Sequence, residues 1–151
     1  MDRRRVEYTI TSDNYTLAEY KKYYFKKYPR RKKFPIKTCL HPSINTWFIL
    51  TRKAMNKLKQ DWKEYIIWLA DKNNMRGLNI KTCELIYKFY KPTKRRFDCD
   101  NHTPKFTNDG LVEANVIVDD DYLHCNPLTI YCSYDKENPR MEIHILEGLK
   151  C

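Results

Sequence analysis

The strongest structural signal in this chain is one long amphipathic helix. Apolar residues recur at helical spacing from Met55 to Leu69, with lysines and Glu64 between them. The spacing predicts a helix that begins at Thr51 or Arg52 and ends near Asn73. A stripe of this kind is far more often core packing than a ligand site, so we assign it to the core.

Strand patterns lie on both sides of this helix. They show period-two alternation or β-branched and aromatic character. The expected strands are residues 6–11, 34–40, 82–90, 128–134 and 141–146, of which the last two form a terminal strand pair. Proline and Ser/Asn residues indicate a turn at 41–45, and Gly77 lies in an expected loop at 73–79.

Two further helices are expected. One runs from Asn101 or Thr103 to about Asn115, with Pro104 in its first turn, where the missing N–H costs nothing. The other is a Tyr- and Lys-rich segment at 15–28. The order of elements predicts an α/β (α+β) fold, in which a mixed β-sheet is packed by two main helices.

The charge of the chain is unevenly distributed. Its 151 residues carry a net charge of +10, and residues 1–38 alone hold twelve bases and four acids. Such a bias favours polyanionic partners such as nucleic acid, although a solvated basic face has the same composition. We expect a basic extension or an elaborated first element over residues 1–33 and the main domain over 34–151.

Several classes of protein are disfavoured by composition. With only three glycines, neither a P-loop nor a dinucleotide fingerprint can be written. We expect no signal peptide and no membrane span, and therefore a cytoplasmic protein with its six cysteines reduced. A zinc site from His124, Cys125 and Cys132 can be imagined, but the spacing matches no zinc pattern.

One segment reverses the basic character of the chain. Residues 98–121 contain seven acids and a single base, Lys105, which gives a net charge of −6. Acids packed this densely repel one another unless a cation neutralises them, and a divalent metal is the usual candidate. Caps and turns are the alternative for each acid alone, because Asp and Asn favour both.

A metal site can be built from the two ends of this segment. In extended chain Asp98 and Asp100 would point the same way, and a helix would then return the chain to Asp119, Asp120 and Asp121. Three carboxylates from these two groups suit Mg²⁺, or Mn²⁺ in its place, better than zinc.

The same residues carry a family resemblance. The chain reads Arg-Arg-Phe-Asp-Cys-Asp-Asn at 95–101, then Lys105, Asp-Gly-Leu-Val-Glu-Ala at 109–114 and Val-Asp-Asp at 118–120. This pattern resembles the RusA family of Holliday junction resolvases, and the resemblance covers roughly residues 34–146. The segments at 41–45 and 57–62 also look like phage-type members.

The resemblance implies a Mg²⁺-dependent homodimeric endonuclease that cuts branched DNA such as a four-way junction. By position, Asp98, Asp100 and Asp120 would be the catalytic metal ligands, and Lys105 the essential lysine. Lys105 stands five residues after Asp100, one more than in the best-known pattern. The closing pair is also a triple, so Asp119 or Asp121 could replace Asp120.

Charged residues outside the predicted metal ligands are expected to bind DNA or to support the site. Lys94, Arg95 and Arg96 are expected to grip phosphates beside the cut. The run Arg30, Arg31, Lys32 and Lys33 is expected to add affinity that does not depend on sequence. Asp109 lies four residues after Lys105, and either orients it or forms a helix-stabilising ion pair with it.

Three other functions remain open at this point. The chain could be a DNA-binding module without catalysis, in which the acids are caps and turns. It could be a metal nuclease for flaps or RNA, since the carboxylate chemistry is the same. It could also be a zinc-stabilised interaction protein.

Overall fold

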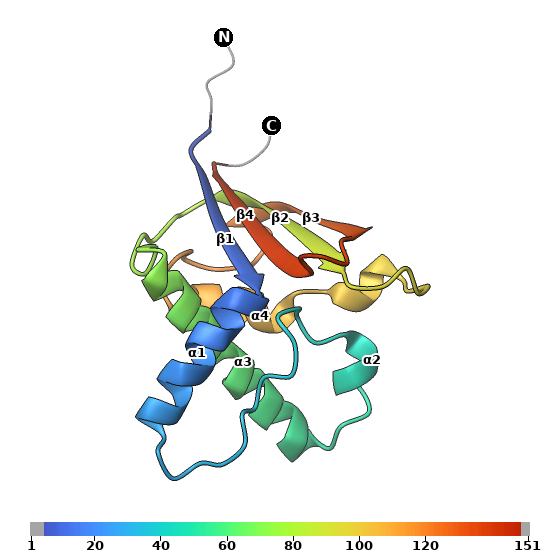
Figure 1. Ribbon diagram of the computed structural model, residues 1–151. Coiled ribbons are helices and arrows are strands. Elements are labelled where there is room, and N and C mark those ends of the chain that lie inside the picture. Colours follow the sequence, from blue (N-terminus) through green and yellow to red (C-terminus); the bar gives the residue numbers. More distant parts are fainter. Residues whose placement is uncertain (1–4, 149–151) are drawn as a thin grey trace.

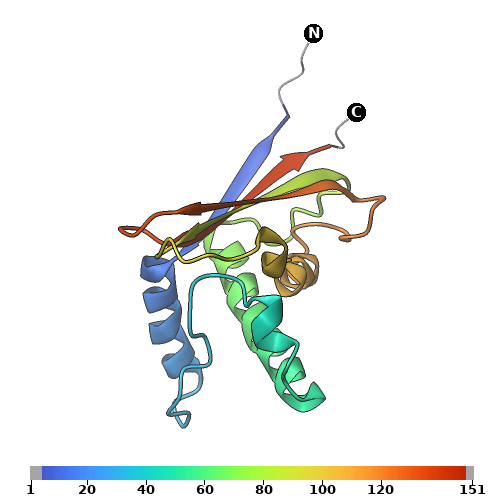
Figure 2. The ribbon, with the colours of Figure 1, turned by 90° about the vertical axis from the view of Figure 1, so that its right-hand side faces the viewer.

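The computed structural model describes residues 5–148, in which a four-stranded mixed sheet forms one layer and helices cover one face of it (Figures 1 and 2). The strands are β1 (Glu7–Asp13), β2 (Cys83–Lys91), β3 (Cys125–Tyr134) and β4 (Arg140–Glu147). Their order is β1-β4-β2-β3; β4 is antiparallel to both of its neighbours, and β3 is parallel to β2. The mixed α+β architecture is therefore confirmed.

The helical layer contains one long helix and several shorter ones. Its members are α1 (Asn14–Lys27), α2 (Ile44–Trp47), α3 (Arg52–Lys72), the 3₁₀ helix η1 (Cys99–His102) and α4 (Lys105–Glu113). In Figure 2 they all lie on the same side of the sheet. Among residues 5–148, no helix combines the length and the apolar character that a membrane crossing requires.

The long amphipathic helix is confirmed as α3. The Thr51 hydroxyl accepts a hydrogen bond from the Ala54 N–H, as an N-cap residue does. The predicted apolar stripe is the part of α3 that packs into the core, where Trp62, Tyr65 and Leu69 are almost fully buried. Each such side chain stabilises the fold by roughly 1.5–3 kcal/mol relative to an exposed position.

Helix α4 packs closely on α3 because Gly110 has no side chain. A Cβ atom at Gly110 would lie 2.9 Å from the Cβ and Cγ2 atoms of Ile66, closer than real Cβ contacts. Leu111 and Ala114 of the same helical region are fully buried. The close contact fixes how the segment that follows η1 lies against the core.

The expected strand at 34–40 is wrong. This segment is irregular, and Ile36, Cys39 and Leu40 are buried between the helices and the sheet. Pro35 removes one backbone donor, which disfavours a place inside a sheet. The backbone oxygen of Cys39 instead accepts a hydrogen bond from the buried Ser12 hydroxyl of β1, at 2.7 Å.

Two further expectations need correction. The last two strands do not pair with each other, because β2 lies between β3 and β4. The helix expected from 101 or 103 to 115 begins after the later of these two positions, because α4 runs from Lys105 to Glu113 and Cys99–His102 form the separate η1. Proline cannot donate a backbone hydrogen bond and disfavours a helical residue before it, so the division falls where the chain contains Pro104.

Strand β1 and helix α1 are both part of the main fold: β1 belongs to the sheet and α1 to the helical layer. Strand β1 pairs with β4 along its whole length, from Glu7 opposite Leu146 to Asp13 opposite Arg140. Asp13 and Thr16 then form a capping box that begins α1. The expected helix at 15–28 is therefore confirmed, and it packs on α3 through aromatic side chains.

The described cysteines are all free. They are Cys39, Cys83, Cys99, Cys125 and Cys132. The sixth, Cys151, lies outside the described residues.

Candidate metal and nucleic-acid site

Asp98 and Asp100 lie at the start of the η1–α4 unit. Asp98 is the N-cap residue of η1, yet its carboxylate makes no capping hydrogen bond. Both side chains are exposed. Asp98 itself is extended, but Asp100 lies within the 3₁₀ turn of η1. The regular strand geometry that would aim these two carboxylates in one direction is therefore not present.

The closing acids lie in the turn between the bridge Ile80–Ile117 and β3. Asp121 organises this turn, because its Oδ1 atom accepts from the N–H groups of Leu123 and His124 and contacts the His124 ring. The contact with His124 lowers the pKa of Asp121. Ligand atoms of Asp119, Asp121 and His124 all lie within 4.8 Å of one another.

Asp120 differs from its two neighbours. Its pKa is raised, first by burial and then by the negative charges of Asp109 and Asp119. A carboxylate in such surroundings gains most from a nearby cation, because the cation would offset the repulsion from the other acids.

The two acidic groups lie near opposite ends of β3. Cys99 of η1 lies near Cys132, whose pKa is raised to about 12 by burial and by this neighbouring thiol. The backbone oxygen of Asp119, in contrast, accepts from the Cys125 thiol at 3.3 Å. Along an extended strand, the seven residues from Cys125 to Cys132 span roughly 23 Å. Within residues 5–148, Asp98 and Asp100 belong to no group of three ligands within 4.8 Å.

Lys105 is the first residue of α4 and is exposed. The expected pairing with Asp109 is replaced by another, since the Asp109 carboxylate lies 3.4 Å from the Lys59 Nζ atom of α3. Asp109 thus joins α4 to α3. The role of Lys105 near a scissile phosphate stays a prediction.

The predicted basic residues form two exposed groups. Lys94, Arg95 and Arg96 lie in the segment between β2 and η1, immediately before Asp98. The second group, Arg30 to Lys33, follows α1. Within it the Arg31 guanidinium stacks 3.9 Å from the Tyr28 ring centre and donates to the Tyr24 hydroxyl, so part of its role is structural.

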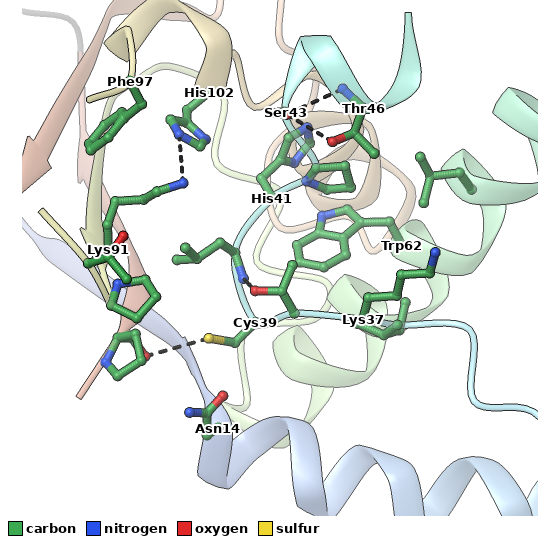
Figure 3. Close-up of a pocket in the computed structure, with 18 of the residues that line it drawn as sticks. Asn14, Lys37, Cys39, His41, Ser43, Thr46, Trp62, Lys91, Phe97 and His102 are labelled. Atoms are coloured by element: carbon green, nitrogen blue, oxygen red, sulfur yellow. Dashed lines mark hydrogen bonds between the residues drawn. The ribbon is translucent and has the colours of Figure 1, made fainter. Parts of the chain in front are cut away.

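A cavity of about 710 Å³ opens beside the first basic group (Figure 3). One wall is the irregular segment 35–43, and the facing wall is residues 91–97 with His102. Arg95 and Arg96 lie at this cavity, whereas Lys94 does not line it and lies over the Tyr134 ring. Sequence reasoning missed this cavity, because the segment 35–43 reads as a strand and a turn.

Two buried histidines stand in the walls of the cavity. His41 is 1% exposed and His102 is 3% exposed. Burial lowers the pKa of His41 to about 3, with a further contribution from His102. Burial, and then the charge of Lys91, lowers the pKa of His102 to about 4. Both rings are therefore neutral near pH 7. The signal available in the sequence was His41 beside Pro42 in an otherwise apolar stretch.

Comparison with known proteins adds no family assignment. Neither a scan against protein-family models nor a search of curated proteins finds a match to this chain. Which metal this site could hold therefore has to follow from the chemistry of its donor atoms. The predicted ligands offer carboxylate oxygens, which fit Mg²⁺ or Mn²⁺. The group of three that the structure gathers adds one imidazole nitrogen from His124, and it contains no cysteine.

Proposed function

We propose that this protein is a Mg²⁺-dependent endonuclease that acts on branched DNA such as a four-way junction, as the RusA-like motif implies. One observation carries the proposal. Asp98, Asp100, Asp119 and Asp120 have no ion-pair partner within residues 5–148, although the chain has a net charge of +10. Unpaired carboxylates beside abundant bases are what a cation site requires.

Asp98 and Asp100 would hold the metal together with a closing acid, Asp120 or its neighbours Asp119 and Asp121. A bound Mg²⁺ supplies charge neutralisation at the phosphodiester and a more acidic water. Binding of a metal by both acidic groups requires η1 and the closing turn to approach each other. The cluster of Asp119, Asp121 and His124 is the half of the site in which the ligand atoms are already close.

The bases of the chain would position the DNA. Arg95 and Arg96 can each hold a phosphate with two parallel hydrogen bonds, because guanidinium matches phosphate geometry. Lys105 would offset negative charge that develops on the non-bridging oxygens. A four-way junction offers two symmetric strands, so a homodimer with two-fold symmetry would present two matching sites.

The test is nicking of a synthetic four-way junction, compared with linear duplex, in Mg²⁺ and in chelator. Asp100→Asn should abolish nicking in Mg²⁺ and leave junction binding equal or stronger, because a charge that repels phosphate is lost. Asp71→Asn is the matched control, since Asp71 is an exposed aspartate at the end of α3 outside the motif. Parallel Asn variants of Asp119, Asp120 and Asp121 identify the closing ligand.

A DNA-binding module without catalysis is the second candidate. It is favoured by the separation of η1 from the closing turn along β3. Junction binding without any metal-dependent nicking, unchanged by Asp100→Asn, would establish this second function and overturn the first. Cleavage of flaps or RNA in preference to junctions would keep the metal chemistry but change the substrate.

A further inference from the structure

The loop between α2 and α3 carries an exposed apolar tip, which consists of Phe48, Ile49 and Leu50. The exposed fraction is 74% for Phe48 and 82% for Ile49, and Ile49 is the most exposed large apolar side chain of residues 5–148. In Figure 1 this loop lies below α2, on the side away from the sheet. Adjacent apolar side chains exposed to this degree indicate a surface that a partner covers.

Contacts on both sides of the tip hold it in place. The Trp47 ring packs against the Phe106 ring of α4, with 5.4 Å between the ring centres. The N–H groups of Phe48 and Leu50 donate to backbone oxygens of α2, at 2.8 and 3.2 Å. The Thr51 cap then begins α3. The exposed side chains therefore project from an ordered turn between two anchored helices.

The surroundings of the tip are strongly basic. Residues 20–60 contain thirteen lysines and arginines and no aspartate or glutamate. Arg52 and Lys53 follow the tip, are exposed, and have no ion-pair partner within residues 5–148. A second copy of this chain at the tip would bring like charges together, whereas a polyanion would neutralise them. The charge therefore favours a polyanionic partner.

The tip also lies beside the residues of the proposed nuclease site. Leu50 lines the cavity that Arg95 and Arg96 also line. Helix α2 lies against η1, which contains the exposed Asp100. Unpaired carboxylates are repelled by the headgroups of an anionic bilayer and by DNA phosphates alike, but a nuclease neutralises them with its metal ion. These neighbours favour DNA over a lipid surface.

We propose that Phe48 and Ile49 form an apolar wedge that inserts between bases at the branch point of the DNA. Proteins open or kink DNA with apolar side chains of this kind, at the cost of unstacking one base step. The cost is lower at a branch, where base stacking is already interrupted. The wedge therefore selects branched over linear DNA, while Arg95 and Arg96 bind phosphates beside it. The inference rests on the proposed binding of branched DNA, but it does not depend on cleavage.

Mobility-shift titrations of a four-way junction and of linear duplex, both in chelator, test this selection. The double variant Phe48→Ala, Ile49→Ala should lose about tenfold in its preference for the junction, within the range for loss of one side chain stacked on a base. Its affinity for duplex should change by less than about twofold, because no positive charge is removed. Leu78→Ala is the matched control, since Leu78 is an exposed leucine beyond the opposite end of α3 and should leave the preference unchanged.

A fluorescent base analogue reports the insertion directly. With 2-aminopurine at the branch point, the unaltered protein should raise the fluorescence, because the analogue brightens when it is unstacked. At saturating concentration the double variant should bind without this rise. Both side chains are exposed, so their replacement should not unfold the protein. Phe48→Leu combined with Ile49→Leu keeps an apolar tip, and should retain both the rise and the preference for the junction.

Three results would overturn the proposal. The first is equal loss of affinity for junction and duplex in the double variant, and the second is an unchanged fluorescence rise in that variant. The third is binding to phosphatidylserine vesicles that requires Phe48 and Ile49 while DNA binding does not, which would assign the tip to a membrane surface.

The outcome is separable from the proposed nuclease activity. A fluorescence rise that depends on Phe48 and Ile49, without any Mg²⁺-dependent nicking, would support the wedge and refute cleavage. Asp100→Asn should keep the rise while it loses nicking. Intact nicking and an intact preference for the junction in the double variant would refute the wedge alone.

Discussion

Thr107→Val is the substitution that most directly tests the buried hydrogen bonds that join Trp62 and His41 through Thr107. Valine has nearly the shape of threonine, so packing around this fully buried position changes little. The Trp62 Nε1–H loses its acceptor, and His41 Nδ1 loses its partner. Each buried polar group left unpaired costs roughly 1–3 kcal/mol, so the free energy of unfolding should fall by roughly 2–6 kcal/mol.

Urea unfolding followed by tryptophan fluorescence measures this loss. For a domain of this size, even a loss of about 2 kcal/mol in the free energy of unfolding lowers Tm by about 4 °C or more. Thr11→Val is the control, because Thr11 lies on the outward face of β1, opposite Glu142. The double variant with Trp62→Phe should be less destabilised than the sum of the two single variants, by about 1–2 kcal/mol. Equal stability of Thr107→Val and Thr11→Val would refute the reasoning.

Three other predictions concern packing, pH and metal. Gly110→Ala should lower stability by about 1–3 kcal/mol, although alanine favours helices, because its Cβ would meet Ile66 at 2.9 Å; thermal unfolding measures this. Burial lowers the pKa of His41 to about 3, so below about pH 6.5 the unfolded chain binds a proton that the folded chain does not. Stability should fall with pH in that window by up to roughly 1.4 kcal/mol per unit, and His41→Phe should reduce the slope of urea midpoint against pH. Adding 10 mM Mg²⁺ to a site with a Kd of about 1 mM should raise the free energy of unfolding by about 1.4 kcal/mol, and Asp119→Asn or chelator should remove this gain in a thermal scan.

Local patterns in the sequence predict the elements that depend on local physics. Helix α3 was predictable because its apolar period and its Thr51 cap both lie within one segment. Strand β2 was predictable from its aromatic and β-branched alternation. Pairing between strands was not, because which strand lies beside which depends on contacts between distant residues. The insertion of β4 between β1 and β2 has no signature within β4 itself.

The same difference between local patterns and contacts of distant residues applies to the candidate site. Composition identifies the acidic segment, because repulsion among its carboxylates is a property of the sequence. The direction of each carboxylate is set by the backbone, and the 3₁₀ turn at η1 replaced the extended stretch that would have aligned Asp98 with Asp100. The His41 cavity needs an irregular segment folded against the loop after β2. No pattern in residues 34–45 indicates that arrangement.

The order of strands also determines when this protein can fold during its synthesis. Glu7 of β1 pairs with Leu146 of β4, so the first strand made has no neighbour in the sheet until the last strand is made. At typical translation rates of 5–20 residues per second, roughly 7–28 s separate the two. Throughout that interval β1 exposes unpaired backbone groups, and the edge of β2 that later pairs with β4 does so once β2 has been made. Such edges favour contact with chaperones or with other chains. Removal of β4 alone would therefore leave the sheet as two separate pieces.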